Sequence, residues 1–157
     1  MEVIKDREYV IGADQAGVEL KNTIKKILDD YTIEYEDIGV NDKSDDTIYP
    51  KIAKKVVEKI IESDYKKEGI LICGTGIGMA ITANKFEGIY AAVCHDIYSA
   101  ERARLSNDTN VLTMGGRIMG PVLAEKILKK WLSLEFQPGR STSKLKEIYN
   151  YEKKNFN

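Results

Sequence analysis

The chain has few of the residues that build metal centres, disulfide frameworks and membrane spans. Its 157 residues include one histidine and two cysteines, which is too few for the usual ligand sets of a zinc site. Cys73 and Cys94 each close an apolar run in separate predicted strands, so we expect free thiols in a reducing compartment rather than a structural disulfide. No apolar run approaches the roughly 18 residues of a membrane-spanning helix.

An apolar leader and an excess of charge of either sign are also lacking. The first ten residues, MEVIKDREYV, carry charges where a signal peptide has its apolar core, which predicts a cytoplasmic protein. Lys and Arg number 24 against 25 Asp and Glu, so neither nucleic acid nor a membrane surface is expected as a partner. With 43% hydrophobic residues, the length fits a single domain over residues 1–157.

A glycine-rich stretch at residues 69–85, GILICGTGIGMAITANK, is the most informative part of the chain. The apolar run 70–72 predicts a buried strand that ends near Cys73. Three alternating glycines follow: Gly74, Gly76 and Gly78. Unpaired amides at the next helix start would bind an anion or a developing oxyanion, and the helix dipole would favour a thiolate. Cys73 is therefore a candidate base or nucleophile; the alternative is a small buried hydrophobe beside glycines that only turn the chain.

The two familiar nucleotide-binding motifs do not fit this stretch. A G-x-G-x-x-G fingerprint would need glycine where Met79 stands, and a phosphate-binding P-loop needs a Lys-Ser/Thr pair that Gly78 and Met79 do not supply. The sequence therefore gives no indication of a nucleotide cofactor.

Short apolar runs alternate with stretches of helical periodicity along the whole chain. Strands are predicted at 9–11, 33–39, 70–72, 89–94 and 110–114, and helices at 20–31, 50–61, 80–83, 97–105, 122–132 and from about 143. Since parallel neighbours need crossover connections, we predict an α/β fold: a Rossmann-like, doubly wound, five-stranded parallel sheet in a three-layer sandwich. The mostly charged helix 143–157, after the Pro138-Gly139 break, is expected to pack on a partner subunit or fray.

Polar residues gather where the predicted strands end, and ligands of parallel sheets bind at the carboxyl ends of the strands. The residues are Asp14, Cys73 to Thr75, His95, Asp96 and Arg117. We expect one cleft to hold them all. Asp14 has two interpretations: an N-cap for the following helix, which its position favours, or a carboxylate that faces the cleft.

Several segments resemble one known family. They are G-x-D-x-A-G at 12–17, Tyr49-Pro50, ICGTGIG at 72–78 with Ala-Asn-Lys at 83–85, Tyr-Ser-Ala at 98–100, NDTNV at 107–111 and Gly139-Arg140. With these, the chain resembles the ribose-5-phosphate isomerase B family, which also contains the galactose-6-phosphate isomerase subunits. The resemblance implies an aldose–ketose isomerase without a metal or other cofactor, a homodimer or homotetramer whose active sites are shared between two subunits.

The resemblance also implies residue roles. Cys73 would move a proton between C1 and C2 through an enediolate while Thr75 and glycine amides hold the oxyanion. The implied catalytic residues are Cys73, Thr75, Asp14 and Ser106. The implied substrate-binding residues are Gly74, Gly76, Gly78, Asn107, Tyr49 and Gln15. The phosphate would be bound by Arg117, Arg140 and Lys144, since a guanidinium fork matches phosphate oxygens.

Two positions depart from the family pattern. The family usually has Asp-His where this chain has Asp14-Gln15, and a histidine where it has Ser106. Similar enzymes use the second histidine to open the furanose ring, whereas a serine hydroxyl does not titrate near neutrality. His95 is a candidate substitute, although its position does not match. Ribose 5-phosphate to ribulose 5-phosphate is the expected reaction; the alternatives are a tetrose-phosphate isomerase, one subunit of a galactose-6-phosphate isomerase, and a catalytically silent sugar-phosphate-binding protein.

Overall fold

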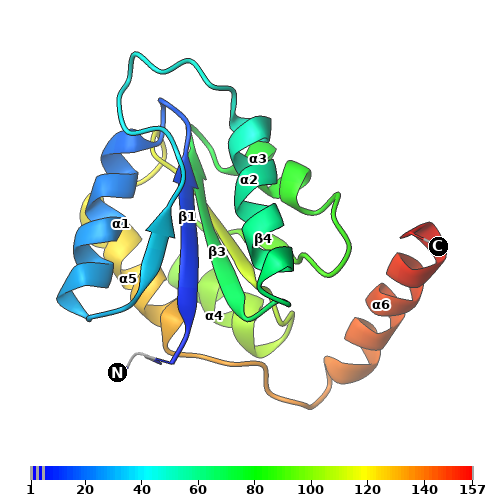
Figure 1. Ribbon diagram of the computed structural model, residues 1–157. Helices are drawn as coiled ribbons and strands as arrows, with labels where there is room; N and C mark the ends of the chain where they lie inside the picture. Colours follow the sequence, from blue (N-terminus) through cyan, green and yellow to red (C-terminus); the bar gives the residue numbers. More distant parts are fainter. Residues whose placement is uncertain (1, 3, 5, 157) are drawn as a thin grey trace.

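The chain's structure, a computed structural model, describes residues 2, 4 and 6–156. In this part of the chain, five strands form one sheet in the order β2-β1-β3-β5-β4, and all neighbours are parallel (Figure 1). The strands are β1 (Glu8–Ala13), β2 (Tyr35–Asp37), β3 (Lys67–Cys73), β4 (Ala91–Val93) and β5 (Val111–Gly115). The predicted α/β fold with a five-stranded parallel sheet is confirmed.

Helices cover both faces of the sheet. They are α1 (Val18–Asp30), α2 (Tyr49–Glu62), α3 (Ile77–Ala83), α4 (Ile97–Leu105), α5 (Pro121–Leu132) and α6 (Thr142–Phe156). Helices α1, α4 and α5 pack on one face, while α2 and α3 pack on the other. Alternate residues of β3 serve the two layers, because strand side chains point to opposite faces: Ile70 and Ile72 pack towards α1 and α5, and Leu71 and Cys73 towards α2 and α3. Burial on both sides explains the continuous apolar run.

The order of the strands places a crevice between the ends of β1 and β3. From β1 the chain crosses to β2 on one side of β1, and then to β3 on the other side. The gap between β1 and β3 is therefore a topological switch point. Ligands of open α/β sheets bind at such points. Asp14 follows β1 and Cys73 ends β3, so the two residues flank the crevice.

The two edge strands are shorter than predicted. The expected strand 33–39 is reduced to Tyr35–Asp37 and the strand 89–94 to Ala91–Val93. Both lie at the edges of the sheet and pair with only one neighbour, and their residues are half-buried. Ile33 and Cys94, beyond these limits, are nevertheless buried, and the Cys94 N–H still donates to the Thr113 carbonyl of β5 at 3.1 Å.

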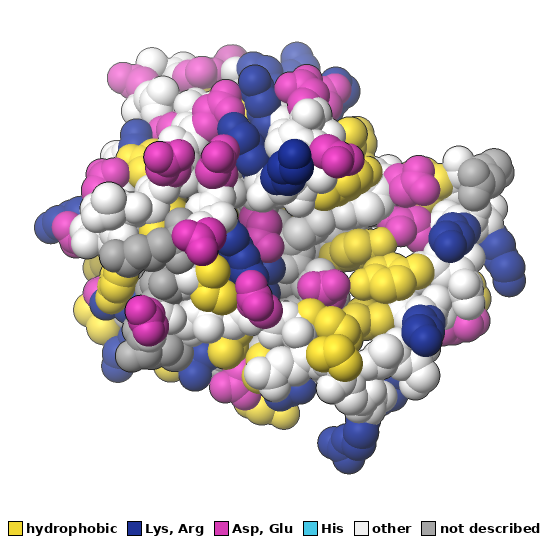
Figure 2. Space-filling view, turned by 60° about the horizontal axis from the view of Figure 1, so that its bottom comes forward, with side chains coloured by type: hydrophobic (Ala, Val, Ile, Leu, Met, Phe, Trp, Pro, Cys, Tyr) yellow, Lys and Arg dark blue, Asp and Glu magenta, His cyan; other side chains and the backbone are white. Residues whose placement is uncertain are grey.

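Helix α6 lies outside the three layers (Figure 1). Leu145 is its one buried residue among those described. Glu152 accepts hydrogen bonds from the Gly88 N–H (2.8 Å) and the Tyr90 hydroxyl, and the rings of Tyr90 and Tyr149 lie 5.3 Å apart. Figure 2 shows hydrophobic side chains between α6 and the rest of the molecule. Packing of α6 on a partner subunit remains a prediction.

None of the helices in the described residues is both long and apolar enough to cross a membrane.

Candidate active site

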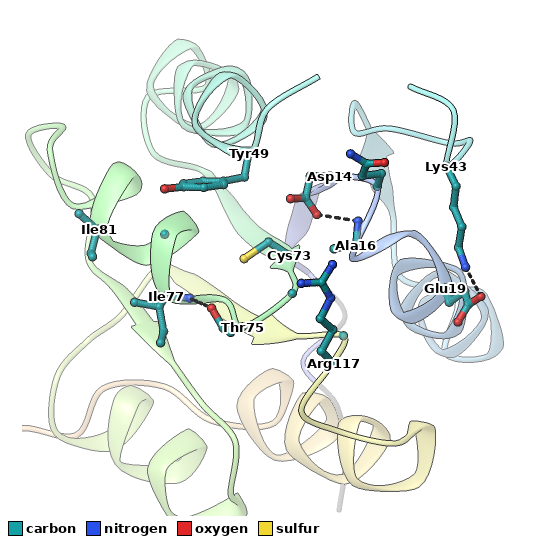
Figure 3. Close-up of a pocket in the computed structure, with 14 residues that line it drawn as sticks. Asp14, Ala16, Glu19, Lys43, Tyr49, Cys73, Thr75, Ile77, Ile81 and Arg117 are labelled. Carbon is teal, nitrogen blue, oxygen red and sulfur yellow. Dashed lines mark hydrogen bonds and ion pairs between the residues drawn. The ribbon is translucent and has the colours of Figure 1, made fainter. Parts of the chain in front are cut away.

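A cavity of about 930 Å³ opens at the carboxyl ends of β1, β3 and β5. Cys73, Asp14 and Arg117 enter it from three different segments and lie near one another, and Tyr49 forms a wall at the start of α2 (Figure 3). Of the predicted site residues, the cavity is lined by Asp14, Gln15, Tyr49, Cys73, Gly74, Thr75, Gly78 and Arg117. Residues as far apart in the chain as Asp14 and Arg117 thus meet at the switch point.

Cys73 ends β3 with 5% of its surface exposed. The backbone N–H of Gly76 donates to its sulfur at 3.0 Å. This contact depends on glycine, because Gly76 has φ +76° and an added Cβ would lie 2.9 Å from the backbone of Met114. Only glycine adopts this conformation without strain. A hydrogen bond from an amide stabilises negative charge on its acceptor, so the Gly76 N–H is placed to stabilise charge on this sulfur.

Thr75 and Gly78 provide polar groups beside the sulfur. The Ile77 N–H donates to Thr75 Oγ1 at 3.3 Å. The backbone N–H groups of Thr75 and Gly78 have no acceptor among the residues that the structure describes. The lack of a side chain at Gly78 also leaves space for the ring of Tyr49, since a Cβ there would lie 2.4 Å from Tyr49 Cε2. The site therefore combines unpaired donors with a flat ring.

Asp14 is held by the turn that precedes α1. Its Oδ1 accepts from the N–H groups of Ala16 (3.0 Å) and Gly17 (3.2 Å). The N-cap is Gly17, without a side-chain cap, so the interpretation of Asp14 as the N-cap itself is wrong by three residues: the chain makes a further turn before the helix begins. Oδ2 has no donor in the described part of the chain and is available to a ligand.

Arg117 is fixed through its backbone. Its N–H donates to the Gly74 carbonyl at 3.0 Å, and the Gly116 N–H donates to the Cys73 carbonyl at 2.8 Å. The side chain passes over Gly74, where an added Cβ would lie 3.3 Å from Arg117 Cδ. No carboxylate within the described residues pairs with this guanidinium. It is a free cation aimed into the cavity.

The remaining basic site residues lie in a second cavity of about 720 Å³, between the end of α4 and the start of α6. Ser106, Arg140 and Lys144 line it, together with Tyr98 and Arg102. No described residue lines both cavities. Within one chain, the structure therefore separates the predicted site residues into two groups. Asn107 is exposed and lines neither cavity.

The expectation of one cleft is wrong for His95 and Asp96, which line neither cavity. They follow the edge strand β4, which β5 separates from β3. His95 Nε2 accepts from the Gly115 N–H at 3.1 Å, so its ring supports the end of β5. Asp96 is the N-cap of α4, and hydrogen bonds from Ser99 lower its pKa. His95 is not placed to substitute for a ring-opening histidine in either cavity.

Sequence reasoning missed part of the lining of the first cavity. Lys43 and Glu19 form an exposed ion pair at 2.5 Å beside it, and Ile77 and Ile81 also line it. Lys43 belongs to the polar loop 41–47, whose composition predicts only a surface position. The isoleucines follow the glycine turn on α3, where their 53% and 58% exposure depends on the tertiary fold.

Known proteins resemble this chain over most of its length. The sequence profile of a family described as ribose/galactose isomerase matches residues 9–148. A ribose-5-P isomerase B of Listeria innocua is 49% identical over 94% of this chain and 99% of that protein, and a D-erythrulose-4-phosphate isomerase of Pectobacterium atrosepticum is 45% identical over 90% and 93%. The solved ribose-5-phosphate isomerase B of Clostridium thermocellum superposes with a TM-score of 0.88, at 40% identity, over 94% of this chain and 99% of that one.

The chain belongs to the ribose/galactose isomerase family. It is a sugar-phosphate isomerase of the aldose–ketose type, as the resemblance predicted.

Proposed function

We propose that Cys73 is the base that interconverts an aldose phosphate and its ketose. The thiolate takes the proton from C2 of the open-chain aldose, the C2–H electron pair forms the C1–C2 double bond, and the carbonyl oxygen becomes an oxyanion. Return of the proton to C1, with transfer of the hydroxyl proton from O2 to O1, gives the ketose. The observation that carries this assignment is the Gly76 N–H on the Cys73 sulfur, inside a cavity shared with Asp14 and Arg117.

The oxyanion and the sugar hydroxyls have suitable partners nearby. The Thr75 hydroxyl and the unpaired amides of Thr75 and Gly78 would stabilise charge that develops on oxygen, the kind of stabilisation that contributes most in many enzymes. Asp14 would accept from a sugar hydroxyl through its open oxygen. Gln15 and Tyr49 would line the sugar.

The proposal for how copies of the chain assemble depends on where the predicted phosphate-binding residues lie. Arg117 lies with Cys73, whereas Arg140 and Lys144 lie in the other cavity, so we propose that a second copy of the chain brings its Arg140 and Lys144 to this site in a homodimer or homotetramer. Exposed hydrophobic residues support the proposal: Ile77 and Ile81 at the first cavity, and Tyr98, 71% exposed, at the second. Contiguous exposed apolar surface marks contact sites.

Ribose 5-phosphate is the first substrate candidate, and a tetrose 4-phosphate the second. A four-carbon 4-phosphate cannot close a furanose ring through its phosphorylated oxygen, and Ser106 offers no imidazole to open one. The similarity to the Pectobacterium atrosepticum protein supports the shorter substrate as well. We expect weak activity on ribose 5-phosphate and relatively better activity on erythrose 4-phosphate.

The test is a panel of aldose phosphates with four, five and six carbons, assayed for ketose formation and for uptake of solvent deuterium at C2. Ser106→His should raise the ratio of kcat/KM on ribose 5-phosphate to kcat/KM on erythrose 4-phosphate, because general acid–base help is worth about 10²–10⁴-fold where ring opening limits the rate. Absence of ketose from every substrate would contradict the proposal. Activity on galactose 6-phosphate only after addition of a sister subunit would assign the chain to the two-component isomerases instead.

A further inference from the structure

The second cavity contains a cation that the assignments above leave unused. Arg102, on α4, lines it with Arg140 and Lys144, and no carboxylate is among its lining residues. The closest carboxylate to Arg102 in the described chain is Glu101, whose Oε1 lies 3.9 Å from NH1. That separation exceeds hydrogen-bond length, and Glu101 also lies 3.5 Å from Lys130 Nζ. Three cations thus face one cavity with little local neutralisation.

Arg102 and Ser106 form one hydrogen-bonded unit. They are separated by four residues on α4, a spacing that makes side chains neighbours on a helix. Arg102 Nε donates to Ser106 Oγ at 2.8 Å, and NH2 donates to the same oxygen. The Ser106 N–H closes the helix on the Arg102 carbonyl at 2.9 Å, so both ends of the unit are fixed.

These contacts determine what the serine hydroxyl can do. Because its oxygen already accepts two guanidinium N–H groups, its own proton must be donated elsewhere. No acceptor among the described residues takes that proton. A hydroxyl polarised by a fixed positive charge is a stronger donor and a weaker base. The unit therefore suits an anionic oxygen better than a proton transfer.

We propose that Arg102 is a further phosphate-binding residue, and that it positions the Ser106 hydroxyl as a second donor to the same phosphate. The proposal rests on the proposed function, because it assumes that the substrate phosphate enters this cavity. It replaces an acid–base role for Ser106 with a binding role. A cation at this position also favours substrates whose anionic group lies close to the ring-opening position, as in a short-chain phosphate.

The experiment compares Arg102→Met, Arg102→Lys, Ser106→Ala and the double variant Arg102→Met/Ser106→Ala. Lys146→Met is the matched control, because Lys146 is an exposed cation of α6 that does not line the cavity. KM and kcat are measured on the best substrate of the panel, and Ki is measured for inorganic phosphate as a competitor. Circular dichroism and thermal unfolding check that each variant is folded.

Arg102→Met should raise both KM and the Ki of phosphate by roughly 10- to 100-fold, the range for one charge-assisted hydrogen-bonding group, with kcat nearly unchanged. Arg102→Lys should recover part of the loss, since the charge remains but the fork is gone. Ser106→Ala should raise KM and the Ki of phosphate by about 3- to 10-fold. In the double variant, KM and Ki should rise by less than the product of the two single effects, because the two residues bind the phosphate as one unit.

Two outcomes overturn the inference: a phosphate Ki for Arg102→Met equal to that of Lys146→Met, or a fall in kcat for Ser106→Ala with KM and Ki unchanged. Failure of the proposed function is a separate result, since a wild-type protein without isomerase activity still allows inorganic phosphate binding to be compared by calorimetry in the same variants.

Discussion

At the scale of single residues, the two cysteines have different chemistry although both are buried. Cys94 is 1% exposed, and burial, with a smaller contribution from the charge of Asp96, raises its pKa to about 12. Its thiol therefore stays protonated at neutral pH and unreactive. Cys73 lies instead in an open cavity with an amide N–H on its sulfur.

This difference predicts selective alkylation. Iodoacetamide at pH 7 should inactivate the enzyme with the label on Cys73, and the substrate should protect. Cys73→Ser should lower kcat by at least about 10²-fold, because the base of the reaction is lost, whereas Cys94→Ala should remain active and be inactivated at the wild-type rate. Peptide mapping of the label gives the answer; a label on Cys94 that accompanies the loss of activity would remove Cys73 from the mechanism.

Arg117 should contribute to binding more than to chemistry. The phosphate carries the same charge in the ground state and the transition state, so its ligands supply uniform binding, which is seen in KM. Arg117→Ala should raise KM by roughly 10- to 100-fold, in line with one lost charge-assisted contact, with a smaller effect on kcat. Steady-state kinetics decides: an unchanged KM with a large fall in kcat would place Arg117 on the reacting atoms instead.

At the scale of elements, the glycine turn could be predicted from sequence because its constraints are local. A strand that ends at a cysteine, followed by alternating glycines, specifies the turn and the helix start without reference to distant residues. His95 could not be placed in this way. It follows a strand just as Cys73 does, but the position of β4 at the edge depends on β5 inserting between β3 and β4, a long-range pairing that local patterns do not encode.

The contact between Gly78 and Tyr49 links α3 to α2 and can be tested by substitution. In Gly78→Ala the new methyl would overlap the Tyr49 ring and push this flexible side chain into the cavity. Alanine is also the better helix former by about 1 kcal/mol, so stability should change little while kcat/KM falls roughly 10- to 100-fold through misplacement of the site. Gly120→Ala is the control, because a Cβ there meets nothing within 4 Å. Equal activity of the two variants would contradict the role of Tyr49 as a wall.

A buried lysine fixes α1 to the loop that leads to the cavity. Lys21 has no exposed surface, and its ammonium donates to Asp37 Oδ1 (2.9 Å), the Val40 carbonyl (2.6 Å) and Asn41 Oδ1 (2.7 Å). All three donors are used. Burial acts to raise the pKa of Asp37, but hydrogen bonds from Lys25, Lys21 and the Gly39 N–H outweigh it, and the pKa is lowered.

The lowered pKa of Asp37 sets the direction of a pH effect. A carboxylate whose pKa is lower in the folded state contributes stability above its unfolded pKa of about 4, and this contribution is lost as the pH falls through the folded value. Asp37→Asn should therefore lower the free energy of unfolding at pH 7 by about 3 kcal/mol, the lower end for breaking a buried ion pair, and by less below pH ~4. Urea unfolding at both pH values checks this; a difference that grows on acidification would contradict the ion-pair account.

At the scale of the whole molecule, the predicted site residues lie in two separate cavities, which we propose to be half-sites of one active site. One holds the thiol, Asp14 and Arg117, and the other holds Arg140, Lys144 and the unit of Arg102 and Ser106. Except for Arg102, the members of both groups could be expected from the sequence. Their separation could not, because it depends on α6 leaving the three layers after the Pro138-Gly139 break, and the sequence does not specify what such a helix packs against.

Hybrid dimers test whether the half-sites complete each other across two subunits. Cys73→Ala and Arg140→Ala chains, each defective alone, are mixed in equal amounts, unfolded and refolded, and assayed at substrate concentrations well below KM. In a two-fold dimer half of the molecules are hybrids, each with one intact site, so about a quarter of the wild-type activity should return. Cys73→Ala mixed with Arg117→Ala is the control: both residues lie in the same cavity of one chain, so every site of the hybrid keeps one defect and no recovery is expected. If hybrids form, as native mass spectrometry would establish, and the first mixture stays as inactive as the control, then Arg140 does not act across the interface and each subunit works with the residues of its own cavity.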